Sequence, residues 1–95
     1  MDDLHFEWDE AKNRSNRANH GVSFEEATGA FFDPNALLID DPDHSGEEDR
    51  FILLGSSTVR LLVVCHCYRG NTIRIISARR ASRREWAHYM SRLRP

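Results

Sequence analysis

The 95-residue sequence predicts one α+β domain spanning residues 1–95, with helices packed on an antiparallel sheet. Two helix starts are marked by a serine that a glutamate follows three positions later, which is the capping-box pattern. In the second half, three strand-like runs are joined by links of only three residues, which is typical of antiparallel hairpins. The expected order of elements is β-α-α-β-β-β-β-α.

The N-terminal part predicts a short strand at residues 6–8 and a helix from residue 9 to about residue 20. Asp9 can accept hydrogen bonds as the N-cap, and Gly21 suits the position that follows the last turn. Most side chains of this helix are polar, so few can contact a core. We therefore expect some of them to serve function.

The second helix begins at a predicted capping box, with Ser23 at the N-cap and Glu26 at the third helical position. It ends before Pro34, because the residue preceding a proline avoids the α conformation. The chain then continues into a short strand at residues 36–39 and an acidic loop at residues 40–49.

The three strand-like runs cover residues 51–56, 60–68 and 72–78. Both faces of the middle run are apolar, which predicts a central strand covered on both sides.

A second capping box, Ser82 with Glu85, opens the C-terminal helix. Its expected core-facing side chains are Trp86, Met90 and Leu93, spaced for one helix face. The opposite stripe carries Arg84, His88 and Arg92.

The net charge of −2 conceals a strong asymmetry along the chain. Residues 1–57 carry four basic and fourteen acidic side chains, whereas residues 58–95 carry nine arginines and a single acid, Glu85. Guanidinium groups bind phosphate through two parallel hydrogen bonds and stack on bases. The asymmetry therefore indicates a nucleic acid or another acidic partner, unless the two halves of the chain simply neutralise each other.

Five arginines cluster where the last strand meets the C-terminal helix. A helix N-terminus already attracts anions, so arginines placed there work against the helix dipole. A bound phosphate would offset that cost, although solubilising arginines on a solvated face are the alternative. The cluster consists of Arg74, Arg79, Arg80, Arg83 and Arg84.

Candidate acid–base groups are His20, His66, His88, Glu85 and Tyr89. RNA cleavage without a metal needs proton transfer and positive charge at the phosphate, and histidine or tyrosine with arginine supplies both. Three of these groups also have a structural alternative. His20 could interact with the C-terminal end of a helix dipole, His66 could be a hydrogen-bonded core residue, and Glu85 fits the capping box.

Other classes of protein are disfavoured. No apolar run approaches the length of a membrane span, and the acidic N-terminus does not resemble a signal peptide, so we expect a cytoplasmic protein. Cys65 and Cys67 lie two residues apart in a strand, a spacing unsuited to a disulfide, and are expected to be reduced. They lack zinc-site spacing, so no metal or other cofactor is expected.

Three stretches of the sequence form a distinctive ordered set. They are Phe6-Glu7-Trp8-Asp9-Glu10-Ala11-Lys12 with Asn16, His20-Gly21-Val22-Ser23-Phe24-Glu25-Glu26-Ala27, and Arg74-Ile75-Ile76-Ser77-Ala78-Arg79-Arg80-Ala81 followed by Glu85 and Tyr89. Together they resemble the BrnT family of toxins. The acidic segment Glu48-Asp49-Arg50-Phe51 and Leu62-Val63-Val64 before a turn also fit, so the resemblance covers nearly the whole chain.

The resemblance implies a RelE-like fold and a metal-independent endoribonuclease that arrests growth by cutting RNA. It also implies a partner, a BrnA-like antitoxin of the ribbon-helix-helix class that forms a heterotetramer with two toxin chains. Operator DNA would be bound only through that antitoxin. Polar family positions match at Lys12, His20, Arg50, Arg79, Glu85 and Tyr89, whereas Asn19 replaces a residue that is usually basic.

Combining motif and charge, we expect Arg79 and Arg80 to bind the scissile phosphate and His20 or His66 to move protons. Lys12 would add charge stabilisation. The expected RNA-positioning side chains are Arg74, Arg83, Arg84 and Tyr89.

Two other functions remain open on the sequence. The chain could be an inactive binding module that acts as a co-repressor with a DNA-binding antitoxin. A DNA-binding protein acting alone is less favoured, because no helix-turn-helix or basic-region pattern is present.

Overall fold

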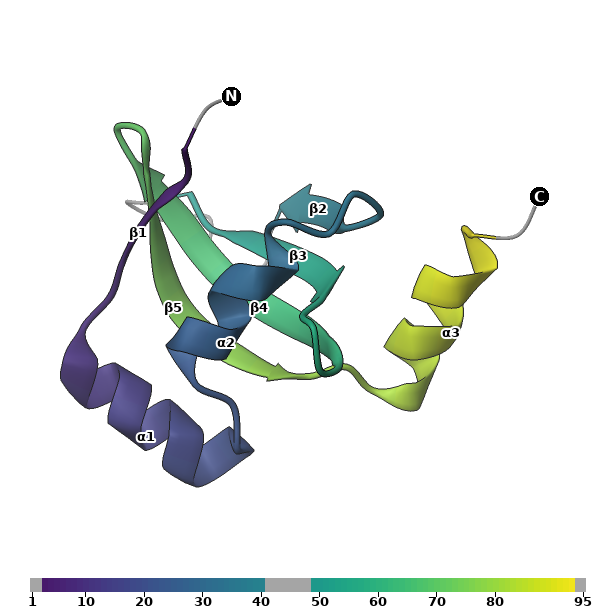
Figure 1. Cartoon of the computed structure of the whole chain (residues 1–95), viewed down its shortest axis with the longest axis horizontal. Coiled ribbons are helices and arrows are strands. Elements are labelled where there is room, and N and C mark those ends of the chain that lie inside the picture. Colours follow the sequence, from purple (N-terminus) through teal and green to yellow (C-terminus); the bar gives the residue numbers. More distant parts are fainter. Residues whose placement is uncertain (1–2, 41–48, 94–95) are drawn as a thin grey trace.

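The computed structural model describes residues 3–40 and 49–93 and confirms the α+β fold with the expected element order (Figure 1). The predicted acidic loop at residues 40–49 falls almost entirely outside these residues. The elements are β1 (His5–Glu7), α1 (Glu10–His20), α2 (Phe24–Ala30), β2 (Leu37–Asp40), β3 (Phe51–Ser56), β4 (Leu61–Arg69), β5 (Thr72–Arg80) and α3 (Arg83–Ser91).

The five strands form one sheet in the order β1-β5-β4-β3-β2. The β3–β4 and β4–β5 hairpins are antiparallel, as predicted, and β4 is central. Strand β2 also pairs antiparallel with β3. Strand β1 instead runs parallel to β5 and pairs only with its first residues, Thr72 to Arg74. A register shift lies between Cys65 and His66, where β5 contributes one extra residue. The rest of the β5 edge is therefore left for α1 to cover.

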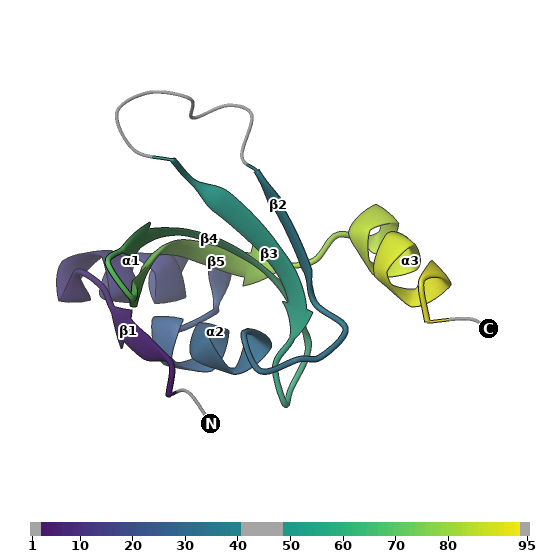
Figure 2. The same cartoon turned by 90° about the horizontal axis from the view of Figure 1, so that it is seen from above.

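Helices α1 and α2 lie on the same face of the sheet (Figure 2). Phe24, Ala27 and Ala30 of α2 are fully buried in the main core, which they form with side chains of β3, β4 and β5. The close approach of α2 requires Gly55 on β3, because a Cβ atom there would lie 2.7 Å from the Ala30 carbonyl oxygen.

Two asparagines of α1 are buried and structural, whereas we expected some of the polar side chains of this helix to serve function. The Asn16 amide donates to the Ala78 carbonyl and accepts from the Ala78 N–H, and so pairs with the exposed edge of β5 as a strand would. Asn13 accepts from the Phe24 N–H and donates to Glu25, which fixes the start of α2. Buried polar groups of this kind are costly unless satisfied, and both amides are satisfied.

The predicted helix caps are confirmed with one exception. Asp9 caps α1, Gly21 ends it in the left-handed conformation with φ 69°, and Ser82 and Glu85 form a complete capping box. Ser23 caps α2 as expected, but the Glu26 carboxylate does not return to it. Glu26 instead accepts two hydrogen bonds from Arg60 on the β3–β4 connection, a charged pair that the local motif could not reveal.

The predicted core face of α3 is wrong. Trp86, Met90 and Leu93 are 53, 37 and 42 % exposed, whereas Tyr89 is 6 % exposed and packs with Leu54 and Val63. The Tyr89 hydroxyl donates to Asp33, which holds the helix beside the end of the sheet, apart from α1 and α2 (Figures 1 and 2). The helix is thus fixed by one aromatic ring and a few polar contacts, and its apolar stripe faces outward.

Candidate active site

A pocket of about 250 Å³ lies on the sheet face opposite α2, at the end of β5. Three segments distant in sequence bring a positively charged or titratable side chain to it. They are His20 at the last residue of α1, Arg50 just before β3, and Arg79 near the end of β5. The remaining lining is formed by Ile52, Val63, Cys65, Ile76, Ser77 and Ala78.

The strand register explains this convergence. Arg79 lies across from Val63, Ser77 from Cys65, and Cys65 from Ile52, so the pocket floor follows a row across β5, β4 and β3. Successive side chains of a strand point to opposite faces, so Arg79 lies on the face opposite its buried neighbour Ala78. Because Asn16 is hydrogen-bonded to Ala78, the C-terminal end of α1 is fixed beside this part of β5.

Arg79 is held by α3. Its two terminal nitrogens each donate a 2.9 Å hydrogen bond to the Glu85 carboxylate, and one of them also donates to the Arg80 carbonyl. This pairing with Arg79, together with the Ser82 N–H, lowers the pKa of Glu85 to about 2. The carboxylate is therefore ionised throughout the neutral range and holds the guanidinium in a fixed orientation.

Within residues 3–40 and 49–93, three of the five guanidinium N–H groups of Arg79 form hydrogen bonds, so two remain available to an incoming phosphate. The Arg79 side chain is 45 % exposed, which leaves it accessible from the pocket.

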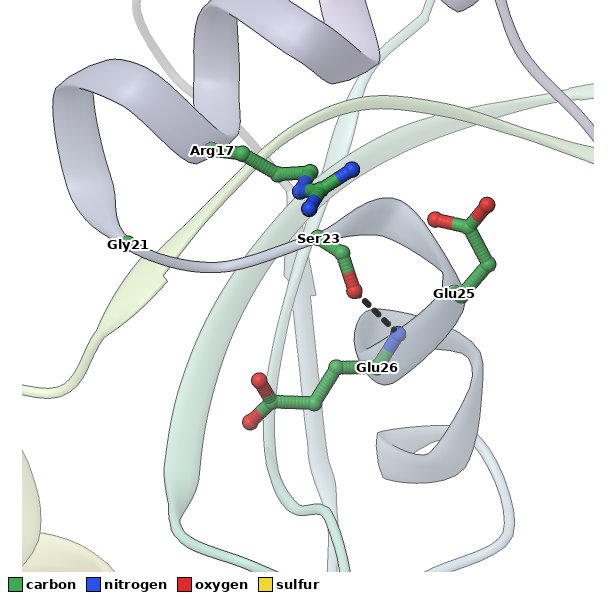
Figure 3. A pocket seen from close by; sticks show the side chains of 5 residues that line it. All are labelled: Arg17, Gly21, Ser23, Glu25 and Glu26. Atoms are coloured by element: carbon green, nitrogen blue, oxygen red, sulfur yellow. Dashed lines mark hydrogen bonds between the residues drawn. The ribbon is translucent and has the colours of Figure 1, made fainter.

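Arg80 points away from Arg79, although the sequence predicted that both bind one phosphate. Its guanidinium lies about 4.0 Å from the position of a Cβ atom at Gly21. The hydrogen bonds from Arg60 chiefly lower the pKa of Glu26, and the charge of Arg80 adds a smaller contribution. That side of the molecule has a separate cavity of about 400 Å³ (Figure 3). Its lining consists of Arg17, Gly21, Ser23, Glu25 and Glu26, so both signs of charge are present.

Lys12 and Arg74 also lie away from the pocket. Lys12 is exposed in the first turn of α1, eight residues before His20, which corresponds to about 12 Å along a helix. Arg74 is near the start of β5 and forms a 2.8 Å ion pair with Glu7 of β1. The structure therefore does not bring either side chain to His20 and Arg79.

His66 and Tyr89, expected to act in catalysis and RNA binding, are both buried, and neither lines the pocket that holds His20 and Arg79. His66 is fully buried, lies edge-on to Phe31 and is bonded to the Val64 carbonyl and the Tyr68 hydroxyl. Burial lowers its pKa and favours the neutral ring. Burial and the hydrogen bond to Asp33 raise the pKa of Tyr89 to about 12. The sequence alternative of a hydrogen-bonded core histidine is thus the one observed.

Arg83 and Arg84 are exposed at the first turn of α3, as the charge pattern predicted. Arg84 does not line the pocket that holds Arg79. It lines a neighbouring apolar groove between α3 and the sheet instead.

Arg50 was not among the expected site residues, although it matched a polar position of the resembled family. It precedes a strand as a lone arginine in an acidic stretch, so local sequence gives no reason to place it beside Arg79. The strand pairing supplies that reason, because the start of β3 and the end of β5 flank the same stretch of β4.

A protein-family model for the BrnT ribonuclease toxin of type II toxin-antitoxin systems matches residues 8–85. The chain belongs to the BrnT family. The match includes His20, Arg50, Arg79 and Glu85, and therefore the whole pocket described above. A comparison with curated proteins found no match.

As a member of a BrnT ribonuclease toxin family, the chain has RNA as its substrate class and an antitoxin as its partner. None of the helices in residues 3–40 and 49–93 has the length and apolar character needed to cross a membrane. The same residues contain no group of three or more His, Cys, Asp or Glu side chains placed to hold a metal ion.

Proposed function

We propose that this BrnT-family chain cleaves RNA in the pocket formed by His20, Arg50 and Arg79. The observation that carries the proposal is the convergence of one imidazole and two guanidinium groups from α1, β3 and β5 at a single pocket. One sheet face thereby offers an imidazole, which can accept or donate a proton, together with two guanidinium charges.

The proposed reaction is attack of the ribose 2′-oxygen on the adjacent phosphorus. The bond between phosphorus and the 5′-oxygen breaks, and the products carry a 2′,3′-cyclic phosphate and a 5′-hydroxyl. The 2′-oxygen loses a proton and the 5′-oxygen gains one. His20 carries one of these transfers and water the other, with no metal ion required.

Arg50 and Arg79 would stabilise the additional negative charge on the phosphorane. Preorganised donors aimed at developing charge are among the largest contributions to catalysis. The Glu85 carboxylate acts here as a positioning group, because it orients Arg79 while leaving two of its N–H groups for the phosphate.

In this proposal Lys12, Arg74, Arg80 and Arg83 contact RNA beyond the scissile phosphate. Backbone phosphate contacts of this kind contribute affinity rather than rate.

We further propose a cytoplasmic toxin that arrests growth and is neutralised by a BrnA-like ribbon-helix-helix antitoxin in a heterotetramer. Family membership supports the toxin and antitoxin classes, and the finer assignments extend from it.

The test is cleavage of a defined RNA by the purified chain in the presence of EDTA. We expect products with 2′,3′-cyclic phosphate ends, and a rate at least about 10²-fold lower for His20→Ala. Asn19→Ala, one residue away and exposed, is the matched control and should retain the rate. Equal rates for His20→Ala and wild type, or activity that EDTA abolishes, would contradict the proposal.

A further inference from the structure

An apolar groove of about 250 Å³ lies between α3 and the outer face of the sheet. Its floor consists of aliphatic side chains from β2, β3 and β4, among them Ile39, Ile52 and Val63, and its wall is the N-terminal half of α3. Ile39 is 53 % exposed. The groove is thus open to a partner and offers it an aliphatic surface.

Arg84 gives the edge of this groove a positive charge. Arg84 and His88 line it, and within the described parts of the chain neither side chain forms a hydrogen bond or ion pair. The acidic side chain in the lining, Glu85, is already bound to Arg79. A complementary occupant therefore presents apolar side chains flanked by carboxylates.

The groove is continuous with the proposed active site. Ile52 and Val63 line both hollows, and Glu85 lines the groove while it binds Arg79 in the pocket. An occupant of the groove therefore lies next to the Arg79 guanidinium, where it would obstruct an RNA phosphate.

We propose that this groove is the docking site for the antitoxin, which inserts an amphipathic segment with an acidic flank. Apolar side chains of the segment cover Ile39 and its neighbours, while carboxylates pair with Arg84 and His88. The inhibitory effect rests on the proposed function of the adjacent pocket, whereas the docking itself does not. Type II antitoxins are proteins, and an aliphatic floor suits a protein segment better than a polyanionic RNA backbone.

The test compares affinities of the purified cognate antitoxin for variants of the full-length chain. Ile39→Asp places a carboxylate on the groove floor and should weaken binding by about 30-fold or more, as loss of a central apolar contact does. Leu38→Asp is the matched control, because Leu38 is a neighbour on β2, 50 % exposed and outside the groove lining. Arg84→Glu should slow association and reduce its dependence on salt.

The same variants decide between occupants. Ile39→Asp should retain RNA cleavage, since Ile39 does not line the active pocket, and Ile39→Ser serves if the aspartate variant does not fold. Unchanged antitoxin affinity in the Ile39 variants would overturn the proposal. The proposal would also be overturned if Trp86→Ser, on the outward stripe of α3, weakened antitoxin binding more than the Ile39 variants do. Two other results would count against it: loss of RNA cleavage in Ile39→Ser, or self-association of the chain through the groove in the absence of antitoxin. Failure of the wild-type chain to cleave RNA would instead contradict the proposed function. The antitoxin affinities of the Ile39 and Leu38 variants would then still test whether the antitoxin docks in the groove.

Discussion

Replacing Arg79 by alanine should abolish most RNA cleavage while leaving the fold intact. The substitution removes a guanidinium that lines the pocket with His20 and Arg50. Loss of one charged donor to the transition state typically costs about 2.7–4 kcal/mol, or about 10²–10³ in rate. The stability cost should be smaller. The Arg79 and Glu85 side chains are 45 and 31 % exposed, and exposed ion pairs contribute about 0.2–1 kcal/mol.

The assay is single-turnover cleavage of a defined RNA, with urea unfolding of each variant to check stability. Arg80→Ala is the matched control, because it removes the same charge from the next residue of β5 on the other side of the strand. We expect its cleavage rate to fall by less than about tenfold, through weaker RNA binding. Arg79→Lys should remain slow, because an ammonium group cannot replace the planar fork. Equal losses for Arg79→Ala and Arg80→Ala, or near wild-type cleavage by Arg79→Ala, would refute the reasoning.

Further expectations concern stability. Asn16→Ala should lower the free energy of unfolding by at least about 2 kcal/mol, because the N–H and carbonyl of Ala78 on β5 both lose their partner. In the same urea titrations Asn19→Ala, the control, should change it by less than about 0.5 kcal/mol. Tyr89→Phe should cost about 1–3 kcal/mol by removing the hydrogen bond to Asp33, and an unchanged midpoint of unfolding would argue against that contact. The pKa of Glu85 is lowered from 4.5 to about 2, so its pairing stabilises the fold above pH 4.5 and is lost as the pH falls towards 2. Calorimetry should therefore show the stability difference between wild type and Glu85→Gln shrinking only within that window.

Local patterns predicted most of the elements. The caps at Asp9, Ser23 and Ser82 depend on neighbours within three residues, and the hairpins depend on short links, so both follow from nearby sequence. The central position of β4 followed from its two apolar faces.

Features set by distant contacts could not be predicted in this way. The parallel pairing of β1 leaves part of β5 open, and only then does Asn16 become a structural residue. Tyr89 faces inward, where Asp33 accepts a hydrogen bond from its hydroxyl, and the more apolar stripe containing Trp86 lies at the surface.

The candidate site shows the same division. Arg79 and His20 could be selected from charge, chemistry and family resemblance. His66 was indistinguishable from a catalytic residue until its burial was known, and Arg50 enters the site only through strand register.

The most direct test of the shared pocket is a double-mutant cycle of RNA cleavage rates for Arg50→Ala and Arg79→Ala. If both guanidinium groups act on one phosphate, each single variant should cleave RNA slowly. The fold-reduction in rate of the double variant should then be smaller, by about tenfold or more, than the product of the two single fold-reductions. A wild-type rate for Arg50→Ala, or losses that simply multiply, would contradict the assignment of both arginines to one active site.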